Sequence, residues 1–270
     1  MITMVEVHTA RGQVLTLPLG DPSYGILVKE IEGLDPVKAT LVSSSFAQQD
    51  GEQYHSSKRE ARNIIIKMDL KPSVIGETTR GLRNSLYNIF MPKSEVRMSF
   101  HSEGYTTLDI IGRIESFECP IFTEEPTATI SIICHDPDFF DPTPVVFEGV
   151  TTDLETEYTF EYEGTIETGV VFELSVDRTH LTGVTFNHRD GADELSSMSV
   201  AVPLVNENVL RIVTIPGEKE ATVSGNSMLY GVSPYAQWIT LEPGTNHISV
   251  FAEGAPMPFS LTYTNKYGGL

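Results

Sequence analysis

The feature that most constrains this chain is a rhythm of short apolar runs, rich in Val, Ile, Thr, Phe and Tyr, interrupted by Gly, Pro, Asn or Asp after roughly eight to twelve residues. Such runs with turn residues between them are typical of short β-strands. Alternation is clear in residues 170–176, where every second residue is apolar, so these side chains share one face of a strand. The rhythm predicts a mostly β protein.

One segment, residues 77–90, breaks the β rhythm. Its apolar residues recur at the helical spacing i, i+4, i+7 and i+8, and they are Leu82, Leu86, Ile89 and Phe90. Pro92 follows and cannot extend a helix. The pattern predicts one amphipathic helix over about residues 78–90, whose apolar stripe covers the edge or face of a sheet.

A cluster of prolines divides the chain. Three prolines within residues 137–144 follow the very apolar run of residues 129–134, and because proline cannot extend a central strand, the sheet must end there. With 270 residues the chain has the length of two ordinary domains. We therefore predict a first β domain, residues 1–142, which contains the helix, and an all-β second domain, residues 143–270, with the strand content of a sandwich or jelly roll.

The net charge of −19 limits what the chain can bind. DNA, RNA and anionic membranes are bound through clustered Lys and Arg, so non-specific binding to these polyanions is disfavoured. Cys119 and Cys134 lie outside any metal-binding spacing and are too few for a disulfide framework. The start lacks the pattern of a secretory signal, and no apolar stretch approaches about 18 residues. We expect a cytoplasmic product with reduced thiols and no membrane partner.

The sequence contains no pattern that indicates an enzyme or a cofactor site. The GxSxG, HExxH, P-loop and GxGxxG patterns are absent, and the histidines are dispersed through the chain. Two glutamate pairs, Glu155 with Glu157 and Glu161 with Glu163, have the residue type that a glycosidase needs. Alternation along a strand instead predicts a solvated face for them. We expect no catalytic residues and no cofactor.

One cluster of carboxylates resembles a metal site. Asp136, Asp138 and Asp141 are close in sequence, and oxygen-rich sites of this kind can hold Ca²⁺. The cluster lacks the glycine and glutamate of an EF-hand loop, and prolines are interleaved with its aspartates. A rigid turn at the domain junction is the favoured interpretation, and no metal is expected.

Several motifs occur in a fixed order along the chain. In the first domain they are residues 62–67 (RNIIIK), 81–86 (GLRNSL) and 130–140 (ISIICHDPDFF). In the second they are residues 210–219 (LRIVTIPGEK), 238–248 (WITLEPGTNHI) and 263–269 (YTNKYGG). This ordered set resembles the distal tail proteins of siphophages, and the resemblance covers nearly the whole chain.

The resemblance implies a fold and a role. The fold is an N-terminal domain of β-sandwich or split-barrel type with one helix and a long hairpin, followed by a C-terminal galectin-like β-sandwich, or jelly roll. The role is structural: a homohexameric ring in the virion tail tip or baseplate, assembled in the host cytoplasm. The ring joins the tail tube protein to the tip hub protein and carries the adsorption apparatus, while DNA passes through its lumen without specific binding. The alternative is a module whose C-terminal sandwich binds a carbohydrate or a receptor-binding protein.

A ring requires a head-to-tail interface between neighbouring copies, repeated with a rotation that brings the last copy back to the first. We expect that interface in two segments of the first domain. Residues 2–19 contain two β runs around a turn, which predicts a hairpin, and residues 38–58 are polar without a packing pattern, which is otherwise typical of a mobile loop. The candidate contact residues are Val5, Val14, Phe46 and Tyr54. An acidic lumen that repels DNA is one hypothesis for the charge, and solubility of the outer domain is the other.

A galectin-like sandwich also suggests sugar binding, for which the candidates are Asn187, Arg189 and Trp238. In a strand, Asn187 and Arg189 share one face while His188 points the other way. Trp238 is the only tryptophan, and it lies in an alternating run that predicts a place in the core or in an interface. The pattern therefore fits a sugar site poorly.

Overall fold

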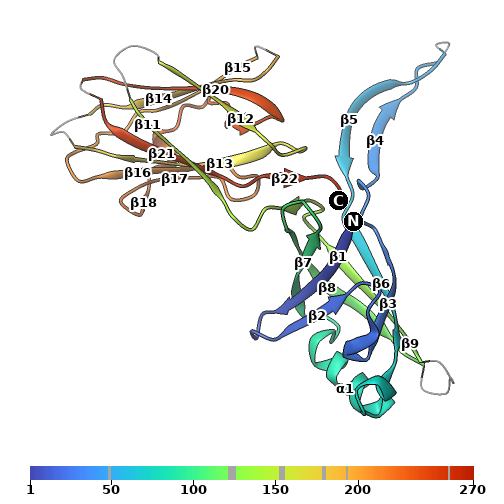
Figure 1. Cartoon of the computed structure of the whole chain (residues 1–270). Helices are drawn as coiled ribbons and strands as arrows, with labels where there is room; N and C mark the ends of the chain where they lie inside the picture. Colours follow the sequence, from blue (N-terminus) through green and yellow to red (C-terminus); the bar gives the residue numbers. More distant parts are fainter. Residues whose placement is uncertain (48–49, 121–125, 152–155, 178–180, 193, 255) are drawn as a thin grey trace. The chain divides into compact units, whose positions relative to one another are not determined.

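The computed structural model describes residues 1–47, 50–120, 126–151, 156–177, 181–192, 194–254 and 256–270. The chain divides into two compact units (Figure 1), one made of Met1–Pro142 with Gly268–Leu270 and the other of Thr143–Tyr267. Antiparallel strands dominate both, and among the described residues there is one α-helix, α1 (Thr79–Ile89). The predictions of a mostly β protein and of a single helix are confirmed. In the described part of the chain, no helix has the length and apolar character needed to cross a membrane.

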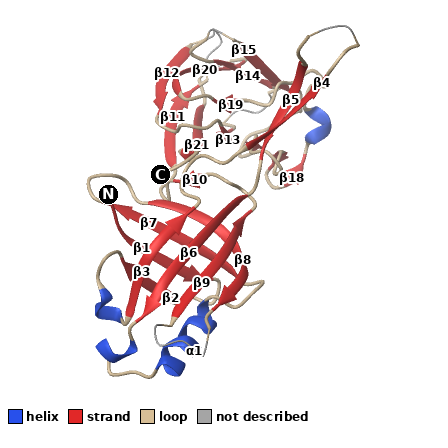
Figure 2. Cartoon of the chain, turned by 90° about the vertical axis from the view of Figure 1, so that its right-hand side faces the viewer, coloured by secondary structure: helices blue, strands red, loops and turns tan. Residues whose placement is uncertain are grey.

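The first unit is built on one sheet with the strand order β2-β1-β7-β8-β9-β6-β3. Its strands are β1 (Ile2–Thr9), β2 (Val14–Pro18), β3 (Ile26–Glu32), β6 (Arg62–Leu70), β7 (Glu95–Ser102), β8 (Leu108–Glu118) and β9 (Thr127–Cys134), and the short β10 (Phe139–Phe140) pairs with β8. A parallel bridge between Leu19 and Val28 links the two outer strands. The sheet thus closes on itself around a common interior (Figure 2).

Alternation explains why this sheet has one apolar side. Along β6 and β9 every second side chain is buried, because successive residues of a strand point to opposite faces. The fully buried residues of the interior include Val5, Val7, Ile64, Ile66, Met68, Met98, Phe100, Ile110, Ile130 and Ile132. The predicted hairpin of residues 2–19 is confirmed, since β1 pairs with β2 and the Thr9 amide donates to the Gln13 carbonyl across the turn.

Helix α1 packs its apolar stripe onto the sheet, as predicted. Thr78 caps its first turn, where the hydroxyl accepts a hydrogen bond from the Gly81 amide at 3.1 Å. Leu82, Leu86 and Phe90 are buried, while the rings of Tyr87 and Phe90 contact Phe117 of β8. Two 3₁₀ turns, η1 (Pro22–Tyr24) and η2 (Pro72–Val74), complete this end of the unit.

A separate two-stranded hairpin belongs to the first unit. Its strands are β4 (Ala39–Ser44) and β5 (Gln53–Arg59), which pair with each other and with no other strand of the described residues. Figure 1 shows the hairpin running beyond the sheet at the end away from α1. Residues 38–58 are therefore largely a hairpin, and the alternative of a mobile loop is wrong for the described strands.

The second unit is a sandwich of two antiparallel sheets. The larger has the order β11-β21-β13-β16-β17-β18, with β19 beside β13, and the smaller has the order β12-β20-β14-β15. The strands of the larger sheet are β11 (Val145–Val150), β13 (Thr168–Ser175), β16 (Val209–Val213), β17 (Glu220–Val223), β18 (Asn226–Ser227), β19 (Thr240–Leu241) and β21 (Pro258–Tyr263). Those of the smaller sheet are β12 (Glu157–Tyr162), β14 (Val184–Arg189), β15 (Leu195–Val200) and β20 (Gly244–Ala252). The turn η3 (Leu229–Gly231) and the short β22 (Lys266–Tyr267) lie outside these sheets.

The core of the sandwich lies between its sheets. Phe172 of β13 and Phe186 of β14 meet with ring centroids 4.1 Å apart, which joins the larger sheet to the smaller one. Phe259 of β21 packs beside Phe172 at 5.2 Å. Aromatic pairs of this kind add about 0.5–1.5 kcal/mol each beyond the area that they bury. Both sheets therefore contribute to one continuous apolar cluster.

Candidate functional site

The hairpin of β4 and β5 is the first candidate for a functional surface. Every residue of β5 is exposed, and four large apolar side chains of the hairpin and its turn have 49–66% of their surface exposed: Leu41, Val42, Phe46 and Tyr54. A hairpin on its own is marginally stable in water, and unpaired strand edges are templates for contact with another chain. The hairpin therefore has the character of a surface that another protein covers.

The base of the hairpin is held by an ion pair. Arg59, the last residue of β5, makes a two-point contact with Asp138, in which Nη2 donates to Oδ2 at 3.0 Å and Nη1 donates to Oδ1. Asp138 is almost fully buried. On the other side of the base, the Thr40 hydroxyl donates to the Glu60 carboxylate at 2.6 Å. These contacts fix the hairpin to the sheet at one end and leave the other end in solvent.

Arg62, which starts β6, reinforces the same region. It is 1% exposed, and its guanidinium donates to the carbonyl oxygens of Gly33 and Asp35 at 2.6 and 2.7 Å. It also donates to those of Pro137 and Gly268, both at 2.6 Å, and stacks over a phenylalanine ring at 4.5 Å. Burial lowers the pKa of this guanidinium. The Arg62 side chain thus joins its own strand to three other segments of the chain, through backbone carbonyls that carry no net charge.

The predicted ring contacts fall in two different environments. The side chains of Val14, Phe46 and Tyr54 are exposed, so each is available to a partner. Val5 is fully buried in the interior of its own unit. Its side chain cannot form part of a ring interface, and that prediction is corrected. The reason is that Val5 and Val7 lie on the face of β1 that points into the interior of the sheet, whereas Met4 and Glu6 point to the other face.

The aspartate cluster forms a turn. The Asp138 carboxylate is engaged by Arg59, and the Asp138 amide donates to the Asp136 carboxylate at 3.3 Å. Within the described ranges, no group of three or more His, Cys, Asp or Glu side chains is placed to hold a metal ion. These contacts match the rigid turn that the interleaved prolines predicted.

The predicted sugar-binding residues have different surroundings. Asn187 and Arg189 share the partly exposed face of β14, as alternation predicted, and His188 points into the sandwich. Asn187 is bonded to Ser197 and Ser249 at 2.9 and 3.3 Å, and Arg189 forms an ion pair with Glu157.

Trp238 is partly buried. It packs against the sandwich core, and the Lys219 ammonium sits 5.5 Å from its ring centre. Its ring is therefore used in packing, as the alternating run predicted.

The inward-facing histidine is part of a small polar network. The Nε2 of His188 lies 2.8 Å from the Asn246 carbonyl oxygen, and the Asn246 amide donates to the carbonyls of Glu242 and Gly244, both at 2.8 Å. Burial lowers the pKa of His188, and the hydrogen bond to Asn246 opposes that shift. The network satisfies buried polar groups of the sandwich.

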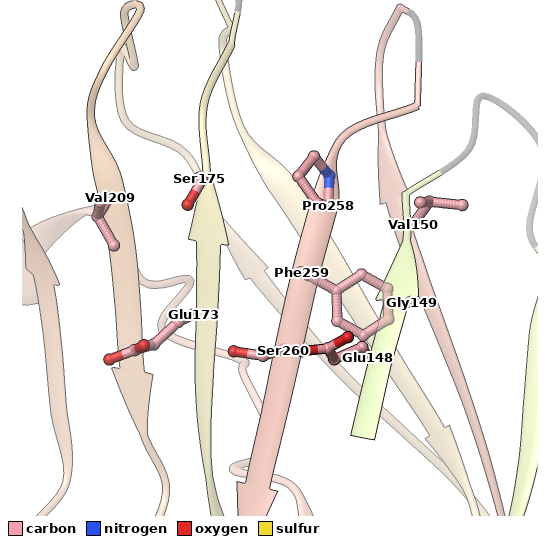
Figure 3. A pocket seen from close by; sticks show the side chains of 9 residues that line it. All are labelled: Glu148, Gly149, Val150, Glu173, Ser175, Val209, Pro258, Phe259 and Ser260. Atoms are coloured by element: carbon pink, nitrogen blue, oxygen red, sulfur yellow. The ribbon is translucent and has the colours of Figure 1, made fainter. Parts of the chain in front are cut away.

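A shallow trough of about 640 Å³ lies on the outer face of the larger sheet (Figure 3). Ser260 of β21 is directly opposite Glu148 of β11 on one side and Glu173 of β13 on the other. Arg211 pairs with Glu173 at 3.2 Å. The one aromatic ring at the trough, that of Phe259, is almost fully buried. The trough can accept hydrogen bonds but offers no exposed ring for stacking.

Three of the four glutamates in the two pairs have the solvated positions that alternation predicted. Glu157, Glu161 and Glu163 are exposed on or beside β12. The Glu161 carboxylate accepts a hydrogen bond from the Thr245 hydroxyl at 3.0 Å. Glu155 lies outside the described residues.

Comparisons with known proteins give one family and one fold. Residues 163–267 match the family model described as the siphovirus-type tail component, C-terminal domain. The crystal structure of the SPP1 Dit protein, described as a paradigm of the hub adsorption apparatus in phages that infect Gram-positive bacteria, is 18% identical with a TM-score of 0.72. The similarity covers 97% of this chain and 98% of that chain, so both units have the same fold as their counterparts.

More distant similarity extends to a baseplate component. One chain of the solved structure of the phage P2 baseplate in its activated conformation with Ca is 10% identical to this chain, with a TM-score of 0.46. The match covers 100% of each chain. The comparison with curated proteins gave no match.

Proposed function

We propose that this chain forms a ring of six copies at the distal end of a phage tail, because its residues 163–267 match the siphovirus-type tail component and its fold is that of SPP1 Dit. The ring joins the tail tube protein to the tip hub protein and is the platform on which adsorption proteins are mounted. The similarity to SPP1 Dit, described as part of a hub adsorption apparatus, supports this role. The single observation of this chain that carries it is the exposed β4–β5 hairpin.

A ring needs two different surfaces on each copy, one of which receives what the other presents. The hairpin is suited to be the presented surface, because its apolar side chains have no covering in their own unit. Burying one such side chain against a neighbour contributes about 1.5–3 kcal/mol. Three or four of them, repeated at every junction, would stabilise a closed ring.

The charge of the chain fits the passage of DNA. At −19 per copy, the net charge of a ring is strongly negative, and a lumen of that sign repels phosphates. DNA would then slide through without being held. A lumen whose surface is net basic in a structure of the ring would contradict this part of the proposal.

The first test is the mass and shape of the particle in solution. Light scattering on a sizing column should give six times the 29.8 kDa of one chain, and negative-stain images should show a central hole. The variant Leu41→Ser/Tyr54→Ser removes two apolar contacts from the hairpin and should yield monomers. The matched control Leu195→Ser/Tyr235→Ser makes the same two kinds of change at exposed residues of the second unit and should leave the ring intact.

Two results would refute the proposal. One is a wild-type chain that stays monomeric both alone and when mixed with its tail tube protein. The other is a ring that the hairpin variant forms as readily as the wild type. Circular dichroism of each variant distinguishes a failure to assemble from a failure to fold.

A further inference from the structure

A groove in the first unit carries positive charge, although the chain as a whole is strongly negative. The groove has a volume of about 460 Å³ and lies between the turn of the β1–β2 hairpin, with Arg11, and the segment that leads from α1 to β7, with Met91 and Lys93. We call it the turn groove. Arg11 and Lys93 are exposed, and in the part of the chain that the structure describes neither forms an ion pair. The carboxylate among the lining residues, that of Glu95, is already paired with Arg113 at 2.7 Å.

Lys93 has a backbone conformation that a lysine rarely adopts. It is the third residue of a turn that the Ser94 amide closes by donating to the Met91 carbonyl at 3.1 Å, and its φ is 76°. The third position of a turn with positive φ normally holds Gly or Asn, because other side chains are disfavoured there. A glycine would therefore give a more stable turn. Since residues in such conformations concentrate at functional sites, Lys93 marks the turn groove as a candidate for binding.

Backbone hydrogen bonds fix both walls of the turn groove. On one side, the Lys93 amide donates to the Ile114 carbonyl at 2.9 Å, and the Ile114 amide donates to the Ser94 carbonyl at 3.0 Å. On the other side, the Thr9 amide donates to the Gln13 carbonyl at 2.9 Å. Because the groove is ordered before anything binds, a partner loses little affinity to the ordering of its walls.

The tip of the β4–β5 hairpin has the opposite charge. A second hollow, of about 380 Å³, lies there and is lined by Phe46, Asp50, Gly51, Glu52 and Gln53. We call it the tip cup. Its described lining contains two carboxylates and no cation, and Phe46, which is 54% exposed, supplies an apolar wall. The Glu52 carboxylate accepts a hydrogen bond from the Ser43 hydroxyl, which is neutral, so the cup keeps its negative charge.

The turn groove and the tip cup lie at opposite ends of the first unit. The groove is beside the last residues of α1, whereas the hairpin runs beyond the sheet at the end away from α1 (Figure 1). With six residues in β4 and seven in β5, the hairpin extends about 20 Å at the rise of a strand. A copy therefore cannot fill its groove with its own tip. Two complementary surfaces at opposite ends of one unit are what a head-to-tail contact between copies needs.

We propose that the tip cup of one copy docks into the turn groove of the next copy in the ring. The two carboxylates of the cup face the two cations of the groove, and Phe46 packs against Met91, which is 55% exposed. The sulfur of a methionine contacts aromatic rings favourably, and opposite charges select this partner and orient it. The inference rests on the proposed ring, because it names the surface that receives the hairpin.

Another tail protein is the competing occupant of the turn groove. Its binding would not require the tip of the hairpin to match the groove, yet the tip has the opposite charge and an exposed apolar side chain of its own. One contact between copies accounts for both hollows, whereas a different protein accounts for only one of them. A second copy of this chain is therefore the favoured occupant.

Cross-linking between full-length chains tests the contact. Asn88→Cys changes the lining of the groove and Gln53→Cys that of the cup, and neither alters a charge. The native Cys119 and Cys134 are buried, so a short thiol-to-thiol cross-linker should not reach them. A mixture of the two variants should give cross-linked pairs, while each variant alone should give only background. Tyr105→Cys is the matched control for the groove variant, because Tyr105 is 79% exposed in the same unit but does not line the groove.

Charge reversal in these cysteine variants tests the pairing. Arg11→Glu/Lys93→Glu in the groove, or Asp50→Lys/Glu52→Lys in the cup, should lower the yield of cross-linked pairs about tenfold, because like charges then face each other. Combining both reversals should restore most of the yield, since the charges are opposite again. Lys93→Gly should also weaken cross-linking, yet it should raise the urea midpoint of the first unit by circular dichroism, because glycine relieves the turn. That result separates loss of contact from loss of fold.

Cross-linking and particle mass report on different claims. A closed ring without the cross-link would refute this contact and leave the proposed function standing, whereas cross-linked pairs without a closed ring would support the contact and refute the ring of six. Cross-linking no stronger than with Tyr105→Cys would overturn the inference, as would reversals that change nothing or a combined variant that recovers nothing. Groove variants that lose only the binding of another tail protein would likewise overturn it, since that protein is then the occupant.

Discussion

Replacing Arg62 tests whether one buried side chain holds the base of the hairpin. Its guanidinium donates to the carbonyls of Gly33, Asp35, Pro137 and Gly268 at 2.6–2.7 Å and is 1% exposed. Arg62→Ala would leave these carbonyl oxygens without their donor and open a cavity. Each buried polar group left unpaired costs about 1–3 kcal/mol. Since water can enter part of the cavity, we expect a loss of about 4 kcal/mol, near the 3–5 kcal/mol found for broken buried ionic contacts.

Urea denaturation can measure this loss in the first unit alone. The only tryptophan, Trp238, lies in the second unit, so its fluorescence follows the second unit, whereas far-ultraviolet circular dichroism follows both. With a slope of about 2 kcal/mol per M urea, the transition of the first unit should move down by about 2 M. The fluorescence transition should stay in place.

Arg113→Ala is the control for Arg62. Arg113 forms an ion pair with Glu95 at 2.7 Å, but its side chain is 56% exposed. Exposed pairs contribute about 0–1 kcal/mol, so this variant should lower the midpoint by less than about 0.5 M. Equal losses in the two arginine variants, or a loss below about 1 kcal/mol for Arg62→Ala, would refute the reasoning that burial makes this contact strong.

Three further predictions concern buried groups and backbone strain. Burial lowers the pKa of His188 in the folded state, so the unfolded state takes up its proton first as the pH falls. The second unit should therefore lose stability below about pH 6.5. His188→Gln should make the urea midpoint of the fluorescence transition less dependent on pH between about pH 8 and pH 5. A Cβ at Gly33 would lie 2.0 Å from a backbone carbonyl oxygen, whereas one at Gly12 would meet nothing within 4 Å, and both residues have positive φ. Gly33→Ala should therefore cost about 3 kcal/mol or more in urea unfolding and Gly12→Ala about 1 kcal/mol. Cys119 and Cys134 are buried and free, and burial raises the pKa of Cys134 to about 12, so a disulfide reagent at neutral pH should label neither thiol until the protein is unfolded.

Local patterns allowed the sequence to predict the local elements. Helix α1 and the β1–β2 hairpin followed from spacing and turn residues within short windows. Alternation alone also predicted that His188 points to the opposite side of its strand from Asn187 and Arg189. These features depend on residues that are neighbours in sequence, which is why they were accessible without a structure.

Features that join distant segments were not accessible. Arg62 reads in sequence as an ordinary charged residue at the start of a strand, and its partners lie between 27 and 206 positions away. Val5 was misjudged for a similar reason: alternation puts Val5 and Val7 on one face of β1, but residues 2–19 do not show that this face points into the interior of the sheet.

The contrast between the two ends of the β4–β5 hairpin bears on its role. At the base, Arg59 is paired with the buried Asp138. At the other end, Phe46 and Tyr54 lie in solvent, where they add nothing to the stability of their own unit. A hairpin that served only to connect β3 with β6 would need neither the buried ion pair nor the exposed apolar residues. Fixing the base reduces the conformational entropy that a partner must remove on contact. The arrangement therefore supports the proposal that the hairpin is an interface element, stabilised by assembly rather than by the isolated chain.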